Sequence, residues 1–213
     1  RDCHGALCQN KGGLCKLMSR DILVIVEHWK GQVDTITYQL LAKGRLVADS
    51  MGVGLSALVL GHQLGNIGEI LKDTGMDTLL VVDDPALGQA GVEVHASVIA
   101  EVVRRIDPGL ILVGYSLVGM ELAPSIAVRL GVIAMTNCIN VDFLAGVFVV
   151  TKPLFEGTVH AKIALEGRGP ALVALQRGAT PTVQLPSKEA FVQSLTIDMQ
   201  AIPVRSKVLE LID

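Results

Sequence analysis

The feature that most constrains the fold of this chain is an alternation of short apolar runs with amphipathic segments between positions 21 and 130. Four runs of strand length lie at 21–26, 55–60, 77–82 and 109–113. Apolar residues at helical spacing follow these runs, at 35–47, 66–75, 95–106 and 119–130. Strands that alternate with helices are typical of an α/β fold with a mainly parallel, open sheet and helices on both faces.

The helical segments carry their own boundary signals. Thr35 is expected to cap the first helix, and its apolar face is expected to contain Leu40, Leu41, Leu46 and Val47. Asn66 and Glu69 have the spacing of a capping box, for a short helix that ends at Gly75. The helix at 119–130 contains Pro124, which a helix tolerates best near its first turn.

The pattern changes after Gly131. The segments 132–143, 147–153, 159–165 and 171–175 are expected to be strands, with no helix between the last three. We therefore expect the sheet to gain antiparallel strands at its far edge, with 202–212 as a last candidate strand. The first 20 residues show no periodicity and are expected to be a tail or linker that precedes one domain at 21–213.

Composition excludes several classes of protein. Half of the 213 residues are hydrophobic and only 18% are charged, whereas disordered chains have the opposite balance. A net charge of −3 and 3% aromatic residues argue against a nucleic-acid partner. Mean hydropathy is high, at +0.51, yet no apolar run reaches the roughly 18 residues of a membrane-spanning helix. A sheet buried on both faces explains this hydropathy, and so does a large partner-binding surface.

Three of the four cysteines, Cys3, Cys8 and Cys15, lie close to the start of the chain, and the fourth is Cys138. Their spacing matches neither a C-x-x-C zinc site nor a ferredoxin run. A relic of such a module is one interpretation, and a loose terminal segment is the better one. Because the chain begins at Arg1 without an apolar signal core, we expect a fragment or processed product in a reducing, cytoplasmic compartment.

The best candidate for a ligand site is the turn between the run at 109–113 and the helix that follows it. Gly114, Ser116 and Gly119 lie there. Small residues at a strand-to-helix turn allow backbone N–H groups to approach an anion, and Ser116 adds a hydroxyl donor. The alternative is a tight turn with a capping serine. Neither a hydrolase nucleophile elbow nor a Rossmann fingerprint fits the spacing.

Other polar residues at expected strand ends favour ordinary structural roles. Glu27 and His28 follow the first strand, and Asp83 and Asp84 follow the third. A strand-end histidine and a turn that uses paired aspartates explain them without a metal or acid–base site. Lys152 and Arg177 end two late strands, where they face an anionic ligand or are plain surface charges. No Ser/His/Asp or Cys/His set is assembled, and no histidine pair has ligand spacing.

Five stretches considered together, at 22–28, 111–131, 151–157, 171–178 and 205–208, resemble the N-terminal domain of the electron transfer flavoprotein alpha subunit. The run at 111–131 is similar to the family's strand, small-residue turn and Leu-Ala-Pro-x-x-Ala helix. Thr-Lys-Pro-Leu-Phe-Glu-Gly at 151–157 resembles the family's Thr-Arg-Pro-x-(aromatic)-Gly-Gly, and the strand before Arg177 resembles one that ends in a family arginine.

This resemblance implies an α/β fold of the adenine nucleotide alpha hydrolase-like group and an electron carrier, not an enzyme. The chain would dock a beta subunit in an FAD-containing heterodimer, with the FAD-binding C-terminal domain absent and AMP or a second FAD in the beta subunit. Electrons would pass from acyl-CoA or related dehydrogenases, as in fatty acid β-oxidation, to a quinone oxidoreductase. The location would be the cytoplasm of a bacterium or archaeon, or the mitochondrial matrix of a eukaryote.

The resemblance carries over site residues one by one. Lys152, Phe155, Gly157 and Arg177 would lie at the edge that faces the partner's flavin. In electron-bifurcating relatives the arginine of the Thr-Arg-Pro motif lies near that flavin. Lys152 keeps the positive charge of that arginine but lacks its planar guanidinium group. Glu156 would repel an anionic flavin. Both differences argue against electron bifurcation.

Two other classes of protein compete with the carrier. A stand-alone nucleotide-binding protein of universal-stress-like type would use the turn from Gly114 to Gly119, although a fuller glycine-rich phosphate loop is absent. A small hydrolase would need a nucleophile and a base, which the sequence does not assemble.

Overall fold

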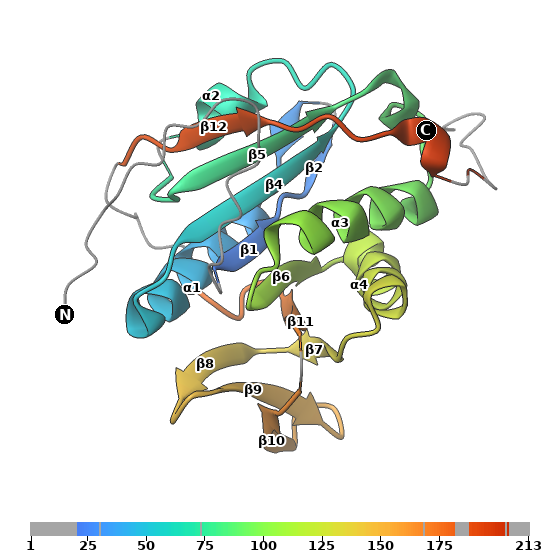
Figure 1. Cartoon of the computed structure of the whole chain (residues 1–213). Helices are drawn as coiled ribbons and strands as arrows, with labels where there is room; N and C mark the ends of the chain where they lie inside the picture. Colours follow the sequence, from blue (N-terminus) through green and yellow to red (C-terminus); the bar gives the residue numbers. More distant parts are fainter. Residues whose placement is uncertain are drawn as a thin grey trace.

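The computed structural model describes residues 21–29, 31–72, 74–167, 169–181, 188–202 and 204. Its centre is a seven-stranded sheet in which every pairing is parallel (Figure 1). In spatial order the strands are β12 (Phe191–Ser194), β5 (Thr78–Asp83), β4 (Leu55–Gly61), β1 (Ile22–Ile25), β6 (Leu110–Tyr115), β11 (Ala171–Gln176) and β7 (Ala134–Cys138). The expected α/β class with a mainly parallel sheet is confirmed.

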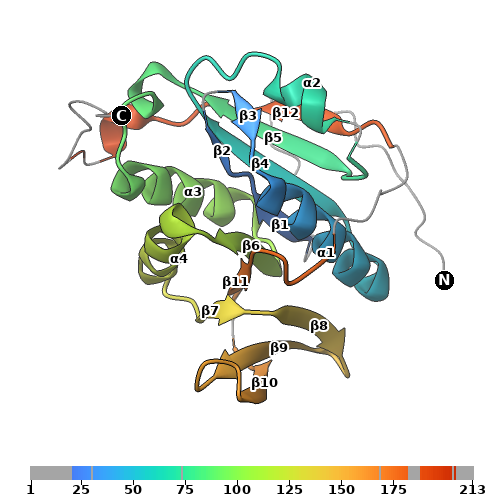
Figure 2. The same ribbon diagram turned by 180° about the vertical axis from the view of Figure 1, so that it is seen from behind.

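Helices cover both faces of this sheet, as the views in Figures 1 and 2 show. One face is packed against α1 (Thr35–Met51) and the short α2 (Ile67–Leu71), and the other against α3 (Val92–Ile106) and α4 (Leu117–Leu130). The remaining small elements are the hairpin of β2 (His28–Trp29) and β3 (Gln32–Val33) and two 3₁₀ turns, Pro85–Leu87 and Met199–Ala201. Within the described residues, no helix has the length and apolar character needed to cross a lipid bilayer.

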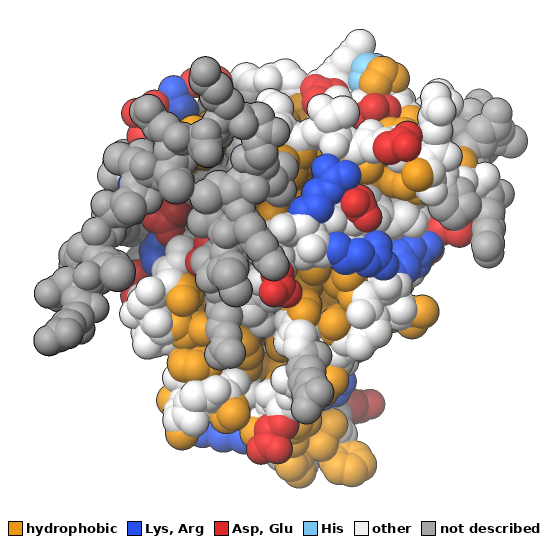
Figure 3. Space-filling model, viewed as in Figure 1, with side chains coloured by type: hydrophobic (Ala, Val, Ile, Leu, Met, Phe, Trp, Pro, Cys, Tyr) orange, Lys and Arg blue, Asp and Glu red, His pale blue; other side chains and the backbone are white. Residues whose placement is uncertain are grey.

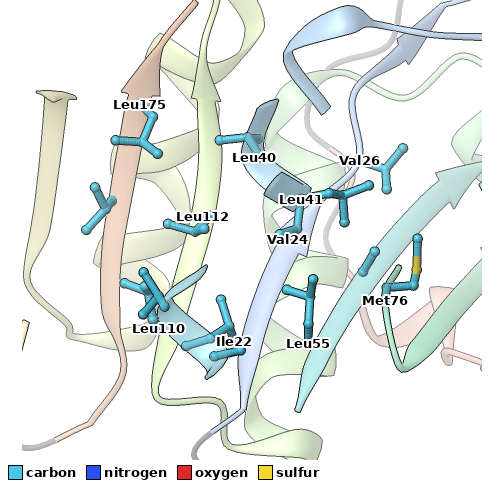
Figure 4. Packing of buried hydrophobic residues seen from close by; sticks show 14 of the residues in the cluster. Ile22, Val24, Val26, Leu40, Leu41, Leu55, Met76, Leu110, Leu112 and Leu175 are labelled. Carbon is cyan, nitrogen blue, oxygen red and sulfur yellow. The ribbon is translucent and has the colours of Figure 1, made fainter. Parts of the chain in front are cut away.

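Strand β1 shows why the apolar runs are continuous. Ile22 and Val24 pack on the face of α1, beside Leu40 and Leu41 (Figure 4), whereas Leu23 packs on the face of α3 and α4. Every residue of β1 is 4% exposed or less. Burial of each such side chain contributes about 1.5–3 kcal/mol. Burial on both faces thus accounts for at least part of the high mean hydropathy.

The antiparallel strands form a sheet of their own instead of extending the main one. This three-stranded sheet has the order β10 (Val159–Leu165), β9 (Val147–Leu154), β8 (Asn140–Leu144), and lies at one end of the molecule (Figures 1 and 2). Strand β11, expected at the antiparallel edge, instead pairs in parallel between β6 and β7. The expected single strand at 132–143 is wrong, because the chain leaves β7 at Cys138 and enters β8 at Asn140, after a positive φ of 60° at Asn137.

Two lysines tie the small sheet to the rest of the molecule. Lys43 of α1 is buried, and its Nζ lies 2.8 Å from Oδ1 of Asp142 on β8. Lys152 of β9 donates from Nζ to the backbone oxygen of Thr136 on β7, at 2.8 Å. Both lysines therefore hold the small sheet in place, one against a helix and one against the main sheet.

Several helix boundaries differ from those expected. Asp34, not Thr35, caps α1, because its Oδ1 accepts from the backbone N–H of Ile36 at 3.0 Å. Leu46 lies outside the buried face of α1 and is 57% exposed. Helix α4 begins at Leu117, two residues before the expected start, and therefore holds Pro124 in its interior.

The helix expected at 66–75 is shorter than predicted. Helix α2 ends at Leu71, and Asn66 makes no side-chain capping bond. Strand β12 was not expected at all. The candidate strand at 202–212 and the tail at 1–20 lie outside the described residues, apart from Ile202 and Val204.

Candidate functional site: the carboxyl edge of the sheet

Because all strands of the main sheet run in one direction, their carboxyl ends meet along one side, which we call the carboxyl edge. Open α/β sheets bind their ligands at this edge. Here the polar side chains that follow the strands come from five of them: Glu27 after β1, His62 after β4, Asp84 after β5, Ser116 after β6 and Arg177 after β11. Ser116 and Arg177 lie at strand ends, as expected from the sequence.

The turn from Gly114 to Gly119 is closely packed. A Cβ on Gly119 would overlap the backbone oxygen of Gly114, and a Cβ on Gly114 would lie 2.7 Å from Cδ1 of Ile36. Ser116 is the N-cap of α4, and its Oγ accepts from the N–H of Gly119 at 3.0 Å. Gly119 is thus required for packing, whereas a side chain at position 114 would displace that of Ile36. The backbone N–H of Gly119 already has an acceptor within the chain.

Glu27 extends from the end of β1 towards this turn. Its Oε2 lies 3.2 Å from the position that a Cβ on Gly114 would take. Burial raises the pKa of the Glu27 carboxyl, and the nearby charge of Asp34 raises it further. A hydrogen bond with Ser116 and the charge of Arg177 oppose this rise in part. A carboxyl whose pKa is raised by burial beside a ligand-binding edge is a functional candidate on physical grounds.

Arg177 reaches across the edge to the start of α1. Its Nη1 and Nη2 donate to the two carboxylate oxygens of Asp34 at 2.7 and 2.9 Å, and Nη1 also donates to Oγ1 of Thr35. Next to it, the N–H of Gly178 donates to Oε1 of Gln39 at 2.9 Å. The guanidinium is therefore already paired with a carboxylate. Sequence reasoning missed Asp34, because nothing in the sequence links positions 143 residues apart.

The residues of the motif at 151–157 lie on the small sheet. Lys152 is half-buried and donates from Nζ to Thr136 of β7, as described above. Phe155, Glu156 and Gly157 form the turn between β9 and β10, all with positive φ, and the side chain of Phe155 is 79% exposed. Within this motif, Lys152 therefore bonds to the main sheet, whereas Phe155 is exposed in the turn.

The acidic residues at the end of β5 have structural roles. Asp83 accepts from the backbone N–H groups of Gln63 and Leu64, at 2.9 and 3.1 Å, and so fixes the loop after β4. Asp84 caps the 3₁₀ turn at Pro85–Leu87. Across the part of the chain that the structure describes, no three His, Cys, Asp or Glu side chains are placed to hold a metal ion.

A known protein family matches most of this chain. The sequence profile of the electron transfer flavoprotein domain matches residues 22–198, from the first residue of β1 to beyond the end of β12. The chain belongs to the electron transfer flavoprotein domain family. The α/β architecture of the described residues is therefore that of an electron transfer flavoprotein domain, and the resemblance found in the sequence is confirmed.

Relatives of this electron transfer flavoprotein domain agree over most of the chain. Protein FixB of Clostridium saccharobutylicum is 30% identical over 91% of this chain and 58% of its own length. The electron transfer flavoprotein subunit alpha of Thermoanaerobacterium thermosaccharolyticum is 28% identical over 90% of this chain and 59% of its own length. The acryloyl-CoA reductase electron transfer subunit beta of Anaerotignum propionicum is 32% identical over 58% of this chain. The chain spans less than two thirds of the length of each of these relatives.

Proposed function

We propose that this chain is the N-terminal module of an electron transfer flavoprotein alpha subunit and docks a beta-type subunit in an FAD-containing heterodimer. The observation that carries the proposal is the family match from β1 to β12, together with alpha-subunit relatives over nine tenths of the chain. The main FAD site would lie outside this module, and AMP or a second FAD would lie in the partner. The module itself would hold the partner and would not make or break bonds.

The donor and acceptor follow from the same family. A dehydrogenase of the acyl-CoA class would reduce the flavin, since one relative is named as an electron transfer subunit of acryloyl-CoA reductase. A quinone oxidoreductase would then accept the electrons. We place the complex in the cytoplasm of a bacterium, in keeping with the bacterial sources of the relatives.

We assign the tip of the β9–β10 turn to partner contact. Phe155 and Glu156 are the central residues of this turn, and Gly157 N–H donates to the oxygen of Leu154 at 3.1 Å. Turns with positive φ at both central residues favour Asn-Gly, and a bulky aromatic there is strained. Strain of this kind is retained where it serves a function, and exposed aromatics are typical anchors of protein interfaces.

The surroundings of Phe155 support the same assignment. Figure 3 shows hydrophobic side chains gathered at the end of the molecule formed by the small sheet. Val159 pairs with Leu154 beside this turn and is 47% exposed, and Leu144, at the opposite end of β9, is 53% exposed. An apolar end of this kind fits a partner that buries a large hydrophobic interface.

The test is purification of the native protein from its source, with the flavin spectrum and the intact mass of each chain recorded. A yellow complex that contains a beta-type chain supports the proposal. A colourless homo-oligomer that carries AMP or ATP would overturn it in favour of a universal-stress-like nucleotide-binding protein.

Variants in the same complex test the assigned surface. Phe155→Ser should weaken the heterodimer by at least roughly tenfold, as loss of an interface anchor does. Val128→Ser is the matched control, because Val128 is 82% exposed on α4, outside the assigned surface. Equal dissociation constants for the two variants would remove Phe155 from the interface.

A further inference from the structure

Among the described residues, Lys43 of α1 is the only charged residue that is buried, with 7% of its surface exposed. Its Nζ lies 2.8 Å from Oδ1 of Asp142, which stands on β8, 99 positions further along the chain. The second oxygen of this carboxylate, Oδ2, accepts from Nδ2 of Asn140 at 2.7 Å. A lysine is almost never buried unless it is paired, so the contact with Asp142 is what allows a charge in this position.

The stability of the fold does not explain this ion pair. Removal of a lysine from water is costly, and attraction to one carboxylate offsets the cost only partly, so an apolar side chain in its place is often neutral or stabilising. Such a side chain would match the buried face of α1, because Leu40 and Val47 lie one turn before and one turn after Lys43 on the same face. A charge that stability does not require indicates a role in specificity.

The pair gives the small sheet a fixed orientation, which apolar contacts alone do not. Val141 and Val150 are buried in the apolar cluster that also contains the inner face of α1. Apolar contacts are non-directional, and they therefore permit the small sheet to turn or slide against α1. The ion pair with α1 and the bond from Lys152 to Thr136 on β7 are point contacts with defined partners. Two such contacts to different elements determine the orientation of the sheet, whereas one would leave it free to turn.

The orientation of the small sheet determines where the exposed Phe155 lies. Asp142 stands opposite Val149 in the ladder between β8 and β9, and β9 ends at Leu154, directly before Phe155. A change in the position of β8 is therefore transmitted along β9 to the turn. Because Lys43 is buried, it does not offer its own surface to a partner, and any effect that it has on binding acts through the sheet.

We propose that Lys43, through Asp142, is a positioning residue that sets the orientation in which the small sheet presents Phe155 to the beta-type subunit. This inference rests on the proposed function, in which the turn between β9 and β10 contacts that subunit. Buried polar and ionic groups are known to specify one arrangement among several at a cost in stability. Lys43 thus contributes to partner affinity and contributes little to the stability of the chain.

The experiment measures two quantities for each variant of the full chain: the dissociation constant of the complex with the beta-type subunit, and the Tm of the chain. The variants are Lys43→Met and Lys43→Gln, each made in the wild-type chain and together with Phe155→Ser. Lys72→Met is the matched control, because it removes a lysine that is ion-paired with Glu69 on α2. Helix α2 and the small sheet lie at opposite ends of the molecule (Figures 1 and 2).

We expect Lys43→Met to raise the dissociation constant about fivefold or more, as residues that act on a binding site from a distance do. Its Tm should stay within about 3 °C of the wild-type value. In the Phe155→Ser background the effect on affinity should fall below about twofold, because two changes that act through one contact are not additive. Lys43→Gln keeps a hydrogen-bond donor without the charge and should have an intermediate effect. If Lys43→Met does not fold, the result for Lys43→Gln decides.

The outcomes separate this inference from the proposed function. If the wild-type chain binds no beta-type subunit, the proposed function fails and the positioning role fails with it. If the wild-type chain binds and Lys43→Met binds as tightly as Lys72→Met, the positioning role alone is overturned. An equal loss of affinity with and without Phe155, or a fall in Tm of more than about 3 °C, would assign Lys43 to the stability of the fold and would also overturn it.

Discussion

Arg177 binds Asp34 through two parallel hydrogen bonds, from Nη1 to Oδ1 at 2.7 Å and from Nη2 to Oδ2 at 2.9 Å. The pair joins the end of β11 to the N-cap of α1 across 143 positions of sequence. Two-point geometry of this kind needs the planar guanidinium, which a lysine does not supply. The pair therefore fixes the angle at which α1 leaves the carboxyl edge.

Arg177→Gln should lower the free energy of unfolding by about 0.5–1 kcal/mol at pH 7, as for a partly exposed pair of good geometry. The hydrogen bond from Arg177 holds the pKa of Asp34 below its ordinary value of 3.8. A lowered carboxyl pKa stabilises the fold above pH 3.8, and this gain is lost as the pH falls through the lowered value. Urea unfolding at pH 7 and near pH 3 should show a smaller difference between variant and wild type in acid.

The control is Lys162→Gln, which removes an exposed cation from β10. Its effect should stay within about 0.5 kcal/mol at both pH values. A loss for Arg177→Gln that is equal at pH 7 and pH 3 would show that the carboxylate of Asp34 is not its source.

Glu27→Gln should become more stable than the wild-type chain as the pH rises. Burial holds the pKa of Glu27 above its ordinary value of 4.5 in the folded chain. A raised carboxyl pKa favours the fold while the group is protonated, and this contribution is lost as the pH rises through the raised value. Unfolding midpoints measured from pH 4 to pH 8 should diverge in favour of the variant. If the unfolding midpoints of the variant and the wild type change with pH in parallel, the result would contradict the burial of the Glu27 carboxyl.

Gly119→Ala should be among the most damaging single changes in the chain. The added Cβ would overlap the backbone oxygen of Gly114, and backbone cannot move aside as a flexible side chain does. We expect a loss of about 3 kcal/mol or more, the upper range for overpacking. Gly68→Ala in α2 is the control, because its Cβ meets a single methyl group at 4.0 Å and should be neutral or stabilising. Thermal unfolding of both variants distinguishes packing from a general intolerance of alanine.

Cys138 should resist alkylation in the folded chain. It is fully buried, and burial raises the pKa of its thiol to about 11, from an ordinary value of 9.0. At pH 8 its thiolate fraction is thus lowered by about 100-fold. Iodoacetamide labelling followed by peptide mapping should modify this cysteine only after denaturation. Labelling at equal rates before and after urea would show that the site opens readily.

The strands of the main sheet were predictable where burial on both faces leaves an unbroken apolar run, as in β1 and β6. The same argument failed at 132–143, because polar and apolar residues continue to alternate after Ile139, so the sequence gives no sign that the chain passes from one sheet to another. It also missed β12, since Phe191 and Val192 are 68% and 47% exposed on a short edge strand. Short edge strands bury few side chains, so their sequences lack the unbroken apolar run that marks a buried strand.

The candidate site was predictable in position but not in detail. Strand-end residues such as Ser116 and Arg177 follow from the parallel order of the sheet. Their partners, Gly119 excepted, come from other elements, and the contacts of Arg177 with Asp34 and of Glu27 with the turn after β6 depend on the packing of the whole edge. The contact of Lys152 with Thr136 was likewise not predictable, because it depends on the position of β7 beside β9.

Strand β11 lies between β6 and β7 but follows both in the chain. During synthesis, β6 has β1 on one side and an open flank on the other until residue 176 has been made. Proteins emerge from the ribosome at about 5–20 residues per second and begin to fold from their N-terminus. The strands of the small sheet are therefore synthesised before β11 can pair with β6 and complete the central sheet. A nascent chain whose synthesis stops within β8, β9 or β10 leaves one edge of β6 unpaired, and that edge can pair with other chains.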